Sequence, residues 1–261
     1  MGTEAVERYS PIPCGRESGH SPDDRPSLDD LLAEPEAHLS RVDRALDDLY
    51  GTPQLSPDGQ PLDGLIETVL SQHTSDVNSE RAFARLRSQF ASWDEVRHAP
   101  PEAIAEAIRC GGLARVKTVR ILEILDSLAD RYGSLNLDVL RDLPLQEARD
   151  ILTSLHGVGP KTASCVLLFS LGRPAFPVDT HVLRLSRRIG LVSPAAGQVA
   201  IQALVESRLR PERIYPLHVN LIRHGRLVCK ALSPLCDRCG IRPLCRYGTA
   251  AAYAGHKSSG A

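Results

Sequence analysis

The chain has 261 residues, 42% of them hydrophobic and 4% aromatic, which is enough for one sizeable core or two small ones. No segment has the character of a signal peptide or a membrane span, so we expect a soluble, intracellular protein with no membrane partner and no disulfides. The net charge of −1 hides an uneven distribution. Residues 1–50 hold twelve Asp or Glu and five Lys or Arg, whereas residues 151–250 hold four Asp or Glu and fourteen Lys or Arg. Such a basic half is typical of proteins that bind polyanions, although a solvated Arg-rich surface gives the same pattern.

Helical periodicity dominates the chain and no segment alternates as a convincing strand, which predicts an all-α fold. Residues 1–27 and the tail 249–261 have the composition of disordered segments. The segment 116–128 is apolar nearly all round, as a central helix would be. The expected helices, in chain order, lie at or around residues 39–50, 62–70, 82–90, 104–108, 116–128, 148–155, 163–171, 180–189, 197–209 and 217–228.

Between two of these helices, Gly157 and Gly159 flank Val158 in a tight hairpin, and Pro160 suits the first position of the next helix. Hairpin amides and a helix N-terminus together form an anion site suited to a phosphate. The positive potential there favours the free amine of Lys161, which is the nucleophilic form. A lysine that only contacts phosphate is the simpler interpretation.

Asp179 follows the hairpin shortly afterwards, in the run Val-Asp-Thr-His at residues 178–181. Its carboxylate could fold back toward the hairpin lysine and stabilise positive charge there. Asp is also a preferred N-cap, so Asp179 could simply begin the helix at 180–189. The two roles are compatible.

Four cysteines near the C-terminus have the spacing C-x6-C-x2-C-x5-C, at Cys229, Cys236, Cys239 and Cys245. In a protein without disulfides, this spacing predicts a metal centre. Structural zinc commonly uses two close pairs, whereas only one is present here, so an iron–sulfur cube fits better and zinc is the alternative. Cys165 lies in an apolar helix and is expected to be a small core residue.

In this order, the hairpin, residues 178–181 and the cysteine spacing resemble the endonuclease III family of DNA glycosylases, within the helix-hairpin-helix superfamily. The resemblance covers about residues 40–248 and includes His-Gly-Arg at 224–226. It implies two helical domains with a cleft between them. Residues 62–175 would form a six-helix barrel-like domain with the hairpin near its end, and residues 28–61 with 176–248 a domain that binds a [4Fe-4S] cluster through the four cysteines.

The resemblance also implies a bifunctional DNA glycosylase and AP lyase of base excision repair, which excises oxidised pyrimidines. Lys161 would be the nucleophile that forms a Schiff base and cuts by β-elimination, and Asp179 its electrostatic partner. The partner would be double-stranded DNA with damaged bases or abasic sites, bound by a monomer in the cytoplasm at the nucleoid. A mismatch-type glycosylase of the same fold and a non-catalytic iron–sulfur DNA-binding protein are the alternatives.

Because a stacked base is out of reach, it must be extruded, and side chains must fill the gap. In the family, one such loop corresponds to residues 71–76, where His73 replaces the usual glutamine and Gln72 stands one position earlier. Leu113 would be the wedge of the second loop, unless it is an ordinary apolar residue beside a helix. The expected DNA-binding residues are Gly157, Val158, Gly159, Gln72, His73, Leu113 and Lys230, with Arg238, Arg242 and Arg246 partly substituting for other basic residues of the cysteine loop.

Overall fold

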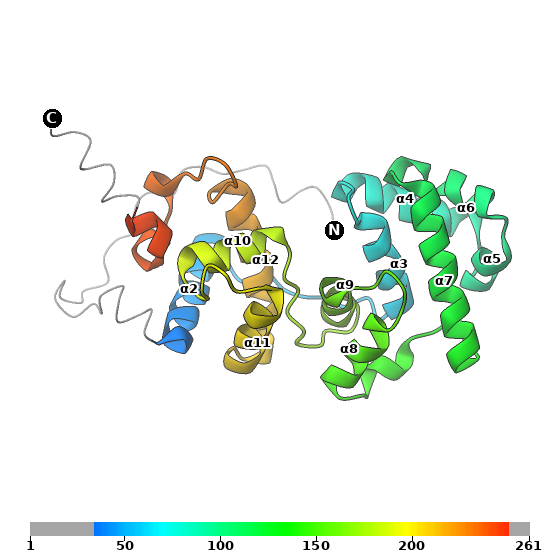
Figure 1. Ribbon diagram of the computed structural model, residues 1–261, viewed down its shortest axis with the longest axis horizontal. Helices are drawn as coiled ribbons and strands as arrows, with labels where there is room; N and C mark the ends of the chain where they lie inside the picture. Colours follow the sequence, from blue (N-terminus) through cyan, green and yellow to red (C-terminus); the bar gives the residue numbers. More distant parts are fainter. Residues whose placement is uncertain (1–33, 251–261) are drawn as a thin grey trace.

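The computed structural model describes residues 34–250, where every regular element is a helix, and this confirms the all-α fold class (Figure 1). The expected disordered segment 1–27 lies outside the described residues, as do residues 251–261. The second expected tail, 249–261, begins two residues too early, because Thr249 and Ala250 are helical. Thr249 donates its N–H to the Cys245 carbonyl at 3.0 Å. The helices are α2 (Pro35–Tyr50), α3 (Pro61–Ser71), α4 (Asp76–Gln89), α5 (Trp93–His98), α6 (Pro101–Ala107), η3 (Arg109–Gly111), α7 (Ala114–Tyr132), η4 (Asp138–Arg141), α8 (Leu145–Thr153), α9 (Pro160–Cys165), η5 (Val166–Ser170), α10 (Thr180–Ile189), α11 (Gln198–Arg208), α12 (Pro211–Leu227), η6 (Cys236–Arg238) and η7 (Arg242–Leu244).

Two of the differences from the expected helices have local reasons. The short α5 was not expected, yet Ser92 caps it by accepting the N–H of Glu95 at 3.1 Å, while the Glu95 carboxylate accepts the N–H of Ala91 at 2.7 Å. The two bonds resemble a capping box, in which the acidic side chain would accept the N–H of the cap residue itself. Helix α12 begins six residues earlier than predicted, at Pro211, and contains Pro216 in its interior. Proline disfavours a helix interior, which is why the sequence placed the start after it.

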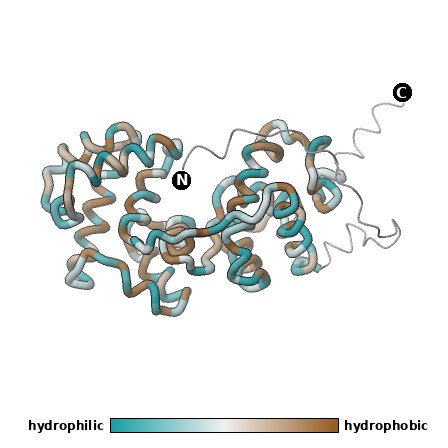
Figure 2. Tube along the Cα trace, turned by 180° about the vertical axis from the view of Figure 1, so that it is seen from behind, coloured by the Kyte–Doolittle hydropathy of each residue, from teal (hydrophilic) through white to brown (hydrophobic). Residues whose placement is uncertain are grey.

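A first hydrophobic core joins helices α3 to α9, from Leu62 to Ala175. Figure 2 shows hydrophobic and hydrophilic stretches alternating along the helices, as expected when one face of each is buried. Helix α7 buries Ile121 and Ile124, but Val116 and Val119 are 53% and 54% exposed. The expectation of a central α7 is therefore wrong, because the helix lies at the surface of this group and covers it with one face.

A second hydrophobic core joins α2, α10, α11 and α12, and includes Ile241 and Cys245 near the C-terminus. Here α2 packs along α12, a contact that the periodicity of the sequence did not indicate. Arg213 of α12 holds α2 by ion pairs with Asp43 at 2.8 Å and Asp47 at 3.1 Å. None of the helices in the described range is both long and apolar enough to cross a membrane.

The segment α9–η5 touches both cores. Leu167 belongs to the first core and Leu168 to the second. The segment changes from α-helix to one turn of π-helix at Val166, and such turns occur frequently at functional sites. The hairpin lysine therefore stands at the start of a helix that lies between the two groups of helices seen in Figure 1.

Candidate active site and DNA-binding surface

The two hairpin glycines are needed for different reasons. Gly157 has a φ of 78°, and a Cβ there would lie 2.4 Å from the Arg120 side chain. Gly159 has an extended φ of −90°, and a Cβ there would meet nothing within 4 Å. Gly159 therefore leaves its backbone open to a ligand, whereas Gly157 allows the turn itself. Val158 is buried and its N–H already bonds the Leu155 carbonyl at 3.1 Å, so it shapes the hairpin and offers no free amide.

Lys161 and Asp179 flank the same buried environment from two helices. Lys161 is half-buried in the first turn of α9. Asp179 caps α10, since its Oδ1 accepts the N–H of Val182 at 2.7 Å. The charges of both residues act on the same two buried side chains, Cys165 and His218. The fold thus brings the amine and the carboxylate into one site, although eighteen positions separate them in the sequence.

The two buried side chains of this site are uncharged at neutral pH. Burial lowers the pKa of His218 to about 4, an effect that the Asp179 carboxylate opposes and the Lys161 ammonium strengthens. Burial raises the pKa of the Cys165 thiol, and here Lys161 opposes the effect. Cys165 is buried as expected, one turn beyond Lys161. The sequence did not single out His218, because a lone histidine on an apolar helix face carries no spacing signal.

The expected gap-filling loop 71–76 separates Gln72 from His73. Gln72 turns inward, where it accepts a hydrogen bond from Arg120 and lies 3.5 Å from the Thr162 hydroxyl. His73 is exposed, with a φ of 54°. Leu113 at the second loop is 57% exposed with a φ of 50°. His73 and Leu113 are therefore the side chains available to a ligand, while Gln72 braces the loop against the hairpin helix.

The four spaced cysteines, Cys229, Cys236, Cys239 and Cys245, line one cavity beside α10 and α12. Burial is the main reason that the pKa of Cys239 is raised to about 12, and the other three cysteines add to it. No three His, Cys, Asp or Glu side chains among residues 34–250 converge closely enough to hold a metal ion. A cube of four irons binds one thiolate at each iron and so spaces its ligands more widely than a single zinc ion does. Four thiols around one cavity are the donor set that such a cube takes.

Several of these sulfurs have nitrogen neighbours. Arg188 donates to Cys229 Sγ at 3.4 Å, and the N–H of Gly248 donates to Cys245 Sγ at 3.3 Å. His224 Nε2 lies 3.4 Å from Cys239 Sγ, and its Nδ1 lies 2.8 Å from the Tyr50 hydroxyl. Hydrogen bonds of this kind orient and stabilise thiolate ligands.

Residues 66–211, more than half of the chain, match the HhH-GPD superfamily of base excision DNA repair proteins. The chain belongs to this family. Endonuclease III of Thermotoga maritima is 35% identical over 196 residues, which cover 75% of this chain and 87% of that protein. A solved structure of a trapped endonuclease III–DNA covalent intermediate has a TM-score of 0.71 and 28% identity, and the match covers 83% of this chain and 98% of that one. These findings confirm the resemblance: the protein is an endonuclease III-type DNA glycosylase.

An Arabidopsis thaliana protein named as a candidate DNA glycosylase is 42% identical over 166 residues. That match covers 64% of this chain but 57% of the plant protein. This glycosylase therefore spans little more than half the length of that relative.

In this glycosylase, two arginines of α10 hold the cysteine loop. Arg184 donates to the Cys229 carbonyl at 2.9 Å, and Arg188 donates to the carbonyls of Lys230 and Ala231 at 2.7 Å each. The helices can approach because Gly225 has no side chain, since a Cβ there would lie 2.8 Å from His181. Sequence reasoning had assigned these arginines only to the general basic surface.

The basic residues expected around the cysteines are not equivalent. Lys230, Arg238 and Arg246 are exposed. Arg242 instead forms an ion pair with Asp237 at 3.1 Å, so its charge is partly offset. Three basic side chains of this region are therefore open to solvent, and the fourth is paired.

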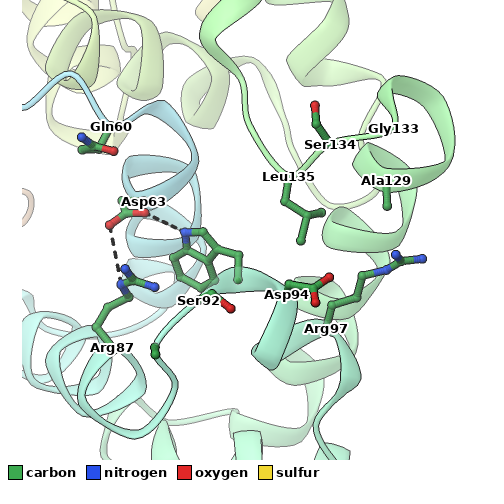
Figure 3. A pocket seen from close by; sticks show the side chains of 12 residues that line it. Gln60, Asp63, Arg87, Ser92, Asp94, Arg97, Ala129, Gly133, Ser134 and Leu135 are labelled. Atoms are coloured by element: carbon green, nitrogen blue, oxygen red, sulfur yellow. Dashed lines mark hydrogen bonds and ion pairs between the residues drawn. The ribbon is translucent and has the colours of Figure 1, made fainter.

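A pocket of about 730 Å³ lies at the far end of α7 (Figure 3). Its charged side chains have partners within the pocket or beside it. Asp63 accepts the Trp93 indole N–H at 2.7 Å and lies 3.8 Å from Arg87, and Arg97 pairs with Asp126 at 2.7 Å. The pocket is lined by neither the hairpin nor the lysine.

Proposed function

We propose that this glycosylase is a bifunctional DNA glycosylase and AP lyase that removes oxidised pyrimidines from double-stranded DNA, with Lys161 as its nucleophile. The observation that carries the proposal is the shared site of Lys161 and Asp179, whose charges both act on the buried Cys165 and His218. A solved relative of this fold is a trapped endonuclease III–DNA covalent intermediate, which supports covalent chemistry at this position.

In the proposed reaction the Lys161 amine attacks C1′ of the damaged nucleotide. The glycosidic bond breaks, and the base leaves with the bonding electrons and takes up a proton. The C1′–O4′ bond then breaks and O4′ takes up a proton, which opens the sugar ring and gives the Schiff base. The Schiff base acidifies the proton at C2′, whose loss breaks the C3′–O bond and releases the 3′ phosphate as the leaving group. Asp179 stabilises the positive charge that develops on the sugar and accepts the proton of the attacking amine.

The neutral neighbours of this pair serve the same chemistry. His218 and Cys165 are buried and bear no charge at pH 7, so they supply an apolar wall without adding a competing ion. Electrostatic interactions are stronger in such surroundings than in water. The carboxylate of Asp179 is thereby the group best placed to stabilise the cationic intermediate, and its bond to Val182 fixes its orientation.

We further propose that Cys229, Cys236, Cys239 and Cys245 hold a [4Fe-4S] cluster. When bound, the cluster would tie the cysteine loop to α10 and α12. The lyase reaction needs no electron transfer, so the residues of this region act by presenting Lys230 and its basic neighbours to the DNA backbone. The gathering of four cysteines around one cavity supports this assignment.

The two hydrophobic cores support the division into two domains, 62–175 and 28–61 with 176–248, with the DNA bound across them. We propose that one copy of the chain suffices, because Lys161, Asp179 and both gap-filling residues come from the same chain. A protein with this substrate acts where the chromosome lies, so we propose a cytoplasmic, nucleoid-associated enzyme.

Borohydride trapping on duplex DNA with one abasic site tests the nucleophile. The reductant converts the C=N bond of the Schiff base to a stable amine, so the wild-type protein is expected to form a covalent adduct. Lys161→Ala should form none, whereas the control Arg210→Ala, which removes an exposed cation paired with Glu212, should keep it. Equal trapping by Lys161→Ala would refute the assignment, and no adduct with any form would favour a non-catalytic DNA-binding protein.

A panel of duplexes tests the substrate class. Thymine glycol, uracil, and mismatched thymine or adenine are compared in single-turnover excision under one salt condition. We expect thymine glycol to be excised fastest. Faster excision of a mismatched base would favour the mismatch-type alternative.

A further inference from the structure

Lys117, in the first turn of α7, is 1% exposed, and its ammonium group is surrounded by oxygens. It donates to the Leu70 carbonyl at 2.5 Å, the Thr74 hydroxyl at 2.6 Å and the Gly111 carbonyl at 2.8 Å. The first two acceptors flank the loop 71–73, and the third lies in the turn before α7. One buried cation therefore holds two loops that are far apart in the sequence.

Both of these loops carry a residue with a disfavoured backbone conformation. His73 and Leu113 have φ values of 54° and 50°, and no other non-glycine residue among 34–250 has a positive φ. A residue with a Cβ adopts this conformation only when the surrounding contacts hold it there. Those contacts include the lysine bonds and a hydrogen bond from the Thr74 hydroxyl to the Gly111 carbonyl, which ties one loop directly to the other.

We propose that Lys117 is a positioning residue for base extrusion, holding the His73 loop and the Leu113 turn in one fixed arrangement so that both side chains enter the duplex together. This rests on the proposed function, in which these two side chains occupy the gap left by the damaged nucleotide. Lys117 is buried and touches neither DNA nor the reacting atoms. Its effect passes through Thr74 and Gly111.

The arrangement matters because extrusion requires the base to be unstacked and unpaired. Two side chains can replace the lost stacking only if they reach the gap at the same time and with the right separation. A preformed abasic site has no base to extrude, so its cleavage depends less on the loops. Loss of the lysine should therefore slow the excision of a damaged base more than the cleavage of an abasic site.

The test compares Lys117→Met, which keeps the length of the side chain but removes its charge and donors, with the wild-type protein. The matched control is Thr118→Val, because Thr118 is equally buried on the same helix and its hydroxyl has no hydrogen-bond partner among the described residues. Thr74→Val, which removes the hydroxyl shared by both loops, is a second and milder variant. Single-turnover rates are measured on thymine glycol and abasic duplexes, with 2-aminopurine opposite the lesion to report opening, and thermal unfolding is recorded for each protein.

We expect Lys117→Met to lower the ratio of thymine glycol excision to abasic-site cleavage about ten- to hundredfold and to slow the 2-aminopurine signal, the size typical of losing hydrogen bonds from a charged group. Thr74→Val should lower the ratio about two- to tenfold, and Thr118→Val should leave it unchanged. If Lys117→Met does not fold, the ratio measured for Thr74→Val tests the proposal.

An unchanged ratio in the folded variants would overturn the proposal, because a purely structural lysine would slow both reactions equally. A wild-type protein that cuts neither duplex would instead overturn the proposed function itself. The two failures are therefore distinguishable.

Discussion

Oδ1 of Asp179 accepts the backbone N–H of Val182 at 2.7 Å, so the proposed catalytic carboxylate is also the N-cap of α10. The N-cap interpretation offered by the sequence is thus confirmed, and it is compatible with the proposed catalytic role of the same residue. The cap fixes the carboxylate relative to α10, and α10 packs against α12, which carries His218. The carboxylate is therefore oriented before any substrate arrives.

Asp179→Asn separates the two roles. Asn is as good an N-cap as Asp, so the free energy of unfolding should change by less than about 0.5 kcal/mol. Loss of the negative charge should slow base excision about 100-fold or more, within the range for a positioned acid–base group. Urea unfolding and single-turnover excision measure the two effects. A variant with unimpaired excision would leave Asp179 as a cap alone.

The two hairpin glycines should respond differently to alanine. Gly157→Ala places a Cβ in a positive-φ position and against Arg120, so it should destabilise the protein by about 1–3 kcal/mol. Gly159→Ala meets no protein atom within 4 Å and should leave stability unchanged, while weakening binding to abasic DNA because the methyl group faces the ligand. Thermal unfolding and a DNA-binding titration test this contrast. Equal stability losses would contradict it.

The salt dependence of DNA binding should distinguish the basic residues near the cysteines. Lys230→Ala is expected to reduce the slope of log K against log salt by about one, as for one lost phosphate contact. Arg242→Ala should change the slope less, because Asp237 already offsets its charge at 3.1 Å. Titrations between about 50 and 200 mM salt provide the slopes. A larger effect for Arg242→Ala would assign the phosphate contact to that residue.

The buried His218 predicts how stability depends on pH. Its pKa is lowered by burial from 6.5 to about 4, so between these values the unfolded chain binds a proton that the folded chain does not. The free energy of unfolding should therefore fall as pH drops from about 6.5 toward 4, by up to about 3 kcal/mol from this residue. Comparing urea unfolding of wild type and His218→Gln at pH 7.5 and 5 measures the contribution. An identical pH dependence in the two proteins would show that His218 does not cause it.

The all-α class, most helix positions and the hairpin could be read from the sequence, because they depend on local periodicity and on glycine and proline at fixed offsets. The range 180–189 is an example, since Asp179 and Gly190 bound that helix through their own backbone preferences. The family resemblance also followed from the order of short motifs.

Other features depended on contacts between segments distant in the chain. Periodicity could not show that α2 packs on α12, that the charge of Asp179 acts on the buried His218, or that Val116 faces solvent. Nor could it separate Gln72, which turns inward to Arg120, from the exposed His73.

By itself, then, the sequence determined which residues could carry the chemistry: an amine after a hairpin, a carboxylate before a helix, and four spaced thiols. Only the tertiary structure decided which of them meet and what holds them. Lys117 illustrates the difference most clearly, because a single lysine near the start of a helix gives no sequence signal. Its role follows only when the fold brings Leu70, Thr74 and Gly111 to its nitrogen, where a buried charge requires oxygens around it.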